Sequence, residues 1–169
     1  QDYRPGEGDL LALAIAKPAV KRRVTGLLKD RGAHFARVIH PSTTVVRTAT
    51  MGEGVVMCPQ TMLMPDSRVG DFVTILNFSG VGHDSVVGDY TTFSSLCDVT
   101  GNVTVGADVF VGAGARLLPG IKVGDGALIG AGATVVRSVK PGNTVYVAPP
   151  KTLKTMSAAA VRDVETGDA

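Results

Sequence analysis

His83 and Asp84 are the adjacent residues of this 169-residue sequence best suited to chemistry. A neutral imidazole can accept a proton near neutral pH, and a carboxylate beside it can orient the ring and stabilise its charged form. This is the pairing that a general base needs. A single surface histidine beside an acidic residue is also common without any function. The pair is therefore a candidate base only if the surrounding elements place the ring where a substrate reaches it.

A six-residue repeat surrounds this pair. Every sixth residue from Val45 to Val135 is apolar, in a sequence that is 44% hydrophobic overall. Chance gives such a run about two times in a million. The next residue is often glycine, and the residue two before the aliphatic is small or β-branched. Residues two apart share one face of a strand, so both should point inward, with the glycine forming the following corner.

The repeat predicts the fold class. Six residues supply one short strand and one turn, and three such units close a coil. The sequence is therefore expected to be mainly β, with a parallel β-helix over residues 45–135 that makes five coils between residues 46 and 135. His83 is the only histidine in these coils, and it stands at a corner, where side chains point away from the core.

A different pattern precedes the repeat. The apolar run 10–15 predicts a buried strand, residues 17–31 a helix whose basic residues, Lys21 among them, lie in solvent, and residues 35–39 a second strand. This βαβ unit looks like half of a doubly wound domain, and because the chain starts at Gln1, upstream sequence is expected to be missing. The tail 152–169 is expected to be disordered or to hold a weak helix around 156–165.

Composition argues against several classes of function. The formal net charge is +2 and no Lys/Arg run exceeds three residues, which does not favour nucleic-acid binding. No apolar run approaches the roughly 20 residues of a membrane span. Cys58 and Cys97 form neither a disulfide framework nor a zinc cluster, so a cytoplasmic location and no metal are expected.

Stacking places further residues beside the candidate base. One coil after His83 comes Gly101, whose backbone N–H could act as an oxyanion donor. A second column holds Asn77, Ala113 and Ala131, small enough to leave a groove for an extended ligand. Turn geometry alone would also account for the glycine and the alanines.

These residues carry a resemblance to a known family. The repeats resemble those of the left-handed β-helix acyltransferases, and the sequence resembles more specifically the family of sialic acid O-acetyltransferases and nucleotide-amino-sugar N-acetyltransferases. The resemblance covers roughly residues 10–151. It rests on Asn77, five residues, His83-Asp84, three residues and Gly88-Asp89, together with Val38-Ile39-His40-Pro41 and the closing Pro149-Pro150-Lys151.

The resemblance implies three segments. Residues 1–44 would be the remnant of an N-terminal α/β, Rossmann-like sugar-nucleotide domain, that is, a partial nucleotide-binding half-domain. Residues 45–151 would be a left-handed parallel β-helix acetyltransferase domain, followed by the C-terminal tail 152–169.

The resemblance also implies a homotrimer that binds acetyl-CoA in grooves between subunits. His83 would be the general base with Asp84 as its partner, and the Gly101 N–H would hold the thioester carbonyl. Ala113 and Ala131 would line the groove for the pantetheine arm.

Two further positions complete the implied site. Asn77 is assigned to the acceptor side. Thr92 stands where some members have a second histidine that contacts the acetyl donor, and it is assigned to acetyl-CoA binding.

The leading hypothesis is an acetyl-CoA-dependent acetyltransferase that N-acetylates an amino sugar carried on a nucleotide. O-acetylation of a sugar or sialic acid is the nearest alternative, and the same base would serve. A γ-type carbonic anhydrase shares this fold but needs three histidines on zinc. A non-catalytic β-helix scaffold is the remaining alternative.

Overall fold

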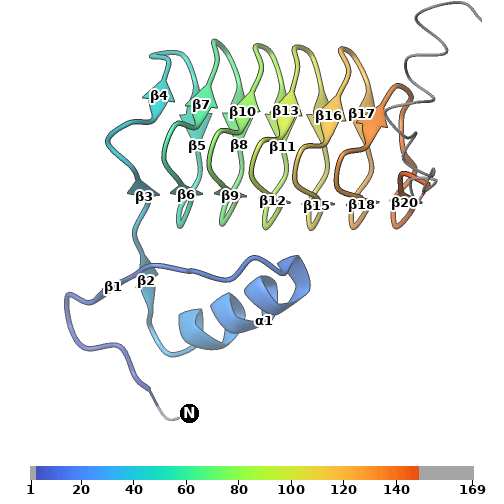
Figure 1. The fold of residues 1–169 in the computed structure, drawn as a ribbon. Coiled ribbons are helices and arrows are strands. Elements are labelled where there is room, and N and C mark those ends of the chain that lie inside the picture. Colours follow the sequence, from blue (N-terminus) through green and yellow to red (C-terminus); the bar gives the residue numbers. More distant parts are fainter. Residues whose placement is uncertain (1–2, 149–169) are drawn as a thin grey trace, which may run out of the picture.

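Short strands recur every six residues along most of the chain. A computed structural model describes residues 3–148, which form a parallel β-helix with a small α/β unit against its side (Figure 1). The expected Pro149-Pro150-Lys151 end and the tail lie outside the described residues.

The strands form three faces of stacked, parallel two-residue strands. The first face consists of β3 (Val38–Ile39), β6 (Val56–Met57), β9 (Thr74–Ile75), β12 (Thr92–Phe93), β15 (Phe110–Val111), β18 (Leu128–Ile129) and β20 (Thr144–Val145). The second consists of β4 (Thr44–Val45), β7 (Met62–Leu63), β10 (Gly80–Val81), β13 (Asp98–Val99), β16 (Arg116–Leu117) and β19 (Thr134–Val135). The third consists of β5 (Thr50–Met51), β8 (Arg68–Val69), β11 (Val86–Val87), β14 (Thr104–Val105) and β17 (Lys122–Val123). The turn after each face is named the first, second or third corner accordingly.

The β-helix extends beyond the expected range at both ends. β3 pairs with β6 and so belongs to the first coil, whereas residues 35–39 were expected to be one strand of the α/β unit. The chain divides there because Val38 N–H donates to Val55 O at 2.9 Å, while β2 (His34–Phe35) pairs with β1. The first coil of the β-helix therefore begins at β3, before residue 44. β20, which pairs with β18, adds a further strand after residue 135.

The inward-facing positions are confirmed. From Ala49 onward, the aliphatic series and the smaller series two residues before it line one continuous core, with Val81 1% exposed and Ser85 fully buried, whereas Val45 is exposed. At the corners, the left-handed backbone conformation falls three residues after the aliphatic, as at Asp84 with φ +56°.

The glycines that follow the aliphatics have a reason other than the expected one. A Cβ at Gly88 would lie 2.6 Å from Ala107 N, and one at Gly112 would lie 2.5 Å from Ala131 N. These positions need glycine because the next coil approaches too closely for a side chain, whereas the left-handed residue stands two positions later.

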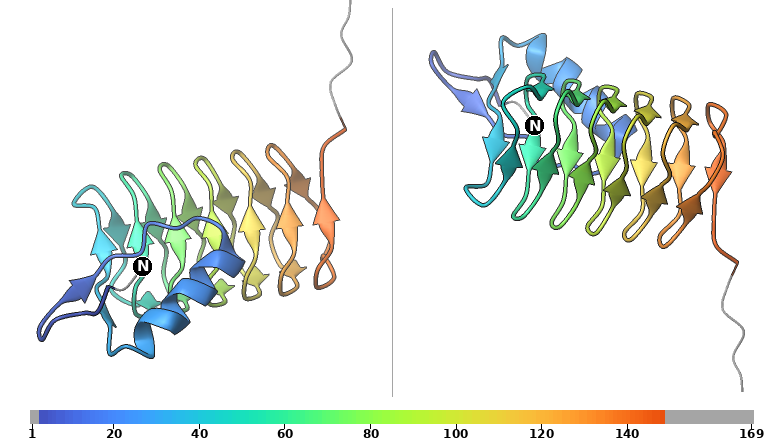
Figure 2. Two further views of the ribbon diagram at one scale, coloured as in Figure 1. Left: turned by 90° about the horizontal axis from the view of Figure 1, so that it is seen from below. Right: turned by 90° about the horizontal axis from the view of Figure 1, so that it is seen from above.

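The α/β unit comprises β1 (Leu10–Leu11), α1 (Pro18–Lys29) and β2, with β1 and β2 parallel as expected of a βαβ unit. The strands β1 and β2 are both shorter than the strands that the sequence predicted at 10–15 and 35–39. α1 lies alongside the stacked coils rather than at their end (Figures 1 and 2). Phe35 packs edge-on against Phe72 at the third corner, and the two belong to a second hydrophobic cluster that joins the unit to the outside of the β-helix.

Candidate active site

His83 stands at the second corner, directly after β10, with an exposed ring. Its Nδ1 lies 2.8 Å from Oδ2 of Asp84, and the two side chains are 59% and 54% exposed. The backbone holds this corner, because Asp84 N–H donates to Pro65 O at 3.0 Å and Asn102 N–H donates to His83 O at 2.8 Å. When Nδ1–H donates to the carboxylate, Nε2 carries the free lone pair, which is the state that a general base requires.

Gly101 lies beneath this ring. β10 pairs with β13 with Val81 opposite Val99, so Gly101 follows directly one coil along, as expected. A methyl group at Gly101 would overlap Nε2 and Cε1 of His83, so the ring keeps this position only while residue 101 is glycine. Nε2 therefore faces the Gly101 backbone across the space of one missing side chain.

The Gly101 N–H has no hydrogen-bond partner among residues 3–148. At the third corner, the backbone N–H in the same position of the repeat donates a hydrogen bond to the side chain of an aspartate in the next coil. Asp71 Oδ1 accepts from Glu53 N–H at 2.9 Å, and Asp125 Oδ1 accepts from Ala107 N–H at 2.9 Å. At the second corner the corresponding residue one coil after Gly101 is Pro119, whose side chain has no acceptor, so the Gly101 amide is left available to a substrate oxygen.

Asn77, Ala113 and Ala131 form the expected column, but at the first corner. Strands β9, β12, β15 and β18 stack in register, which aligns the residues that follow them. Ala113 and Ala131 are exposed, and Asn77 is half-buried. A full face of the coil separates this corner from that of His83, so one chain does not bring the column to the candidate base.

Thr92 does not fit its expected role. It is fully buried on β12, and its Oγ1 accepts a hydrogen bond from Lys21 Nζ at 2.8 Å. α1 covers this outward-facing position, so the hydroxyl is closed to acetyl-CoA. Thr92 instead helps to hold α1 on the β-helix.

Lys21 corrects a second expectation, because it is fully buried rather than solvated. Nζ also donates to Phe72 O and Thr74 Oγ1, at 2.8 and 2.9 Å. Burial lowers the pKa of Lys21 to about 7, and the charge of Asp108 opposes this shift. The sequence carried no signal for this burial, because a lysine on an amphipathic helix normally faces water.

Two other basic side chains of α1, Arg22 and Lys29, contact residues at the third corner. Arg22 Nη2 pairs with Asp108 at 2.6 Å, and its guanidinium lies 4.1 Å from the centre of the Tyr90 ring. Lys29 pairs with Glu53. These basic residues hold the helix against the coils and form no free patch for a ligand.

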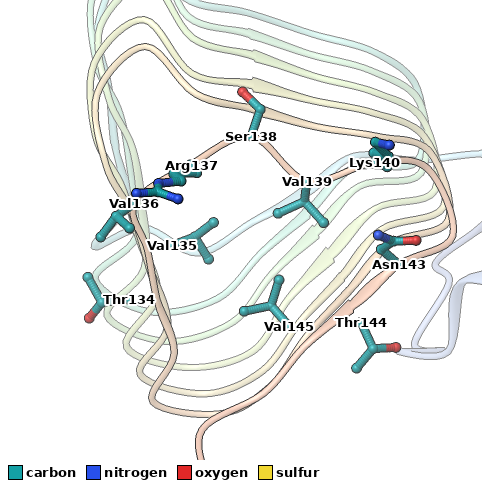
Figure 3. Close-up of a pocket in the computed structure, with 10 residues that line it drawn as sticks. All are labelled: Thr134, Val135, Val136, Arg137, Ser138, Val139, Lys140, Asn143, Thr144 and Val145. Atoms are coloured by element: carbon teal, nitrogen blue, oxygen red, sulfur yellow. The ribbon is translucent and has the colours of Figure 1, made fainter.

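A cavity of about 570 Å³ lies at the last coil (Figure 3). Val135, Val139 and Val145 point into this open end of the coil. None of its lining residues is a histidine, a cysteine or a carboxylate, and it is separated from β10 by several coils. The reactive groups therefore lie at the second corner and not in this cavity.

Comparison with known proteins agrees with the fold and the motif. Residues 102–137 match the family model of the bacterial transferase hexapeptide (six repeats). WeeI from Acinetobacter baumannii AYE is 31% identical with a TM-score of 0.82, over 89% of this chain and 73% of that protein. No curated protein sequence matches the chain.

Two further solved structures resemble the chain. PerB from Caulobacter crescentus, in complex with CoA and GDP-perosamine, is 30% identical with a TM-score of 0.79, over 82% of this chain and 67% of that protein. The acetyltransferase domain of PglB from Neisseria gonorrhoeae FA1090, in complex with acetyl coenzyme A, is 28% identical with a TM-score of 0.77, over 85% of this chain and 70% of that one.

The chain belongs to the family of sialic acid O-acetyltransferases and nucleotide-amino-sugar N-acetyltransferases. It is a hexapeptide-repeat acyltransferase with a left-handed β-helix. Within the described part of the chain, α1 is too short and too polar to cross a membrane.

Proposed function

We propose that this acyltransferase moves an acetyl group from acetyl-CoA to the amino group of a nucleotide-linked sugar, with His83 as general base. The observation that carries the proposal is the position of His83 Nε2 over Gly101, with Nδ1 held by Asp84 at 2.8 Å. The complex of PerB with CoA and GDP-perosamine supports this class of donor and acceptor.

The geometry suits each step of the transfer. His83 Nε2 takes a proton from the acceptor amine as its nitrogen attacks the thioester carbonyl carbon. The carbonyl π electrons move to oxygen, where the Gly101 N–H donates a hydrogen bond to the developing negative charge. The C–S bond then breaks, His83 returns the proton to the departing sulfur, and the products are the N-acetylated sugar and the free thiol. Asp84 holds the ring in the required tautomer and stabilises it while it is charged.

We propose a homotrimer, because one chain separates the groups that the reaction needs. The proposed base stands at the second corner, while Ala113 and Ala131, proposed to line the pantetheine arm, and Asn77, proposed for the acceptor side, stand at the first. A groove between two subunits would bring a first corner of one chain to a second corner of another.

Exposed apolar side chains at the first corner support this assembly. Phe78 and Leu96 are 57% and 62% exposed, although both have the left-handed backbone conformation that costs a bulky residue free energy. Phe72 and Tyr90 occupy the same position of the turn at the third corner and are covered by α1. A second copy of the chain would cover Phe78 and Leu96 in the same way.

The α/β unit is proposed to belong to the part of the enzyme that holds the sugar nucleotide. The chain spans 67–73% of the length of the compared proteins PerB and WeeI. The buried Lys21 fixes α1 to the coils and would set the distance between the nucleotide and His83.

The test is a panel of nucleotide-linked amino sugars, GDP-perosamine among them, incubated with the enzyme and acetyl-CoA. Each acceptor is paired with its analogue that bears a hydroxyl in place of the amine. Release of free thiol, together with a mass gain of one acetyl group on the amine only, is the expected result. Acetylation of the hydroxyl analogues instead would show an O-acetyltransferase, because His83 can deprotonate either group. Acetyl-CoA turnover with none of the acceptors would count against the proposal.

A cytoplasmic location is also proposed, since Cys58 and Cys97 are both free thiols. Cell fractionation followed by immunodetection would test it.

A further inference from the structure

Ser85 directly follows the proposed base and its partner, but its side chain points into the coil. The residue is fully buried. Its Oγ donates a hydrogen bond to Thr100 O at 2.8 Å and accepts one from Val103 N–H at 3.0 Å. Both partners belong to the next coil, so this hydroxyl ties the second corner to the turn that contains Gly101.

The carbonyl that Ser85 contacts and the amide proposed to bind the substrate are two ends of one peptide group. Thr100 O and Gly101 N–H share the delocalised bond between residues 100 and 101, which keeps the group planar. A donor on the oxygen draws electron density toward it and makes the N–H a stronger donor. Ser85 therefore acts on the Gly101 N–H without touching the substrate.

Neighbouring groups restrict this peptide from two other sides. A methyl group on Gly82 would overlap the carbonyl of Thr100 and lie 2.8 Å from Gly101 N, so the backbone of Gly82 packs against the peptide plane. The imidazole of His83 covers Gly101 itself. Among residues 3–148, the hydroxyl of Ser85 makes the only hydrogen bond to this peptide group, and it sets the tilt of the peptide.

We infer that Ser85 is a positioning residue that orients and polarises the Thr100–Gly101 peptide as the oxyanion donor of the transfer. This inference rests on the proposed role of the Gly101 N–H. It extends the site to a buried residue that approaches the reacting atoms only through the backbone.

Ser79 provides a matched control. Its Oγ donates to Ser94 O at 2.7 Å and accepts from Cys97 N–H at 3.0 Å, so it makes the same two contacts one repeat earlier, at the first corner. The peptide that it holds does not lie under His83. Loss of the Ser79 hydroxyl should therefore lower stability as much as loss of the Ser85 hydroxyl. It should leave the stretching frequency of the bound thioester carbonyl unchanged.

The experiment is difference infrared spectroscopy of acetyl-CoA labelled with ¹³C at the thioester carbonyl and bound to the full chain. A hydrogen bond to this carbonyl lowers its stretching frequency relative to free acetyl-CoA. Ser85→Ala should lose roughly a tenth to a third of that shift, the share expected from cooperative polarisation. Ser79→Ala should keep all of it, and calorimetry should give the same acetyl-CoA affinity for both variants.

The outcomes separate the inference from the proposed function. If wild-type enzyme binds acetyl-CoA with no lowering of the carbonyl frequency, the role of the Gly101 N–H fails, and with it the inference. If wild type shows the shift and Ser85→Ala keeps it in full, only the role of Ser85 is overturned. Should Ser85→Ala not fold, Ser85→Thr retains a hydroxyl and should show the wild-type shift, as Thr91 makes the equivalent contact with Gly106 O at 2.8 Å. A folded Ser85→Thr that lost the shift would contradict the inference.

Discussion

Replacing Lys21 by methionine should change how the stability of this protein depends on pH. The side chain is fully buried, and burial lowers its pKa from the ordinary 10.5 to about 7. Between these two values the unfolded chain binds a proton that the folded chain does not. The free energy of unfolding of the wild type should therefore rise as the pH rises through this window. Below the folded pKa both states are protonated, so Lys21 should no longer make the free energy of unfolding depend on pH.

The magnitude follows from the size of the window. One proton contributes about 1.4 kcal/mol per pH unit, so between about pH 7.5 and about pH 9.5 the wild type should gain about 2.5 kcal/mol relative to Lys21→Met. For a chain of this length that is a difference of about 5–10 °C in melting temperature. Asp108 is the charged group that opposes the lowering of the Lys21 pKa.

The assay is urea denaturation of both proteins at a series of pH values and at one fixed protein concentration. Lys29→Met is the control, because Lys29 pairs with Glu53 and its pKa is raised. The stabilising effect of the Lys29–Glu53 pair is lost only above the ordinary lysine pKa. The difference in free energy of unfolding between wild type and Lys29→Met should therefore not change with pH across the same window. Parallel curves for wild type and Lys21→Met would mean that Lys21 is charged in the folded protein, and would refute the reasoning from burial.

The other predictions concern the proposed site and assembly. His83→Ala should reduce kcat by ~10²–10⁴-fold in steady-state assays with little change in acetyl-CoA affinity, and a folded variant with near-normal kcat would remove the proposed base. Gly101→Ala should also reduce kcat, because its methyl group displaces the His83 ring; unchanged kcat would show that the ring position is unimportant. Ala131→Trp should weaken acetyl-CoA binding in calorimetry while the assembly remains intact, and undiminished binding would move the donor groove elsewhere. Phe78→Asp should convert a trimer to monomers in light scattering, and a monomeric wild type would refute the trimer itself.

The repeat allowed the β-helix and the core of the site to be predicted from the sequence. In a parallel β-helix of regular coils, residues in contact are separated by a constant number of positions along the chain. Counting therefore placed Gly101 beside His83, and pairing of β10 with β13 confirms it. The same counting aligned Ala113 with Ala131. These contacts follow from local periodicity alone.

The sequence could not predict contacts between parts of the chain that are not related by the six-residue repeat. The position of α1 on the coils depends on how two separate surfaces fit, and it is this fit that buries Lys21 and covers Thr92. The six-residue period likewise located the glycines but not the reason for them, since the clash of a Cβ at Gly88 with the next coil exists only after the coils have stacked. The sequence by itself thus determined which residues of the β-helix are neighbours, because its coils repeat. Only the tertiary structure decided which polar groups the docked helix removes from water, because that depends on the shape of both surfaces.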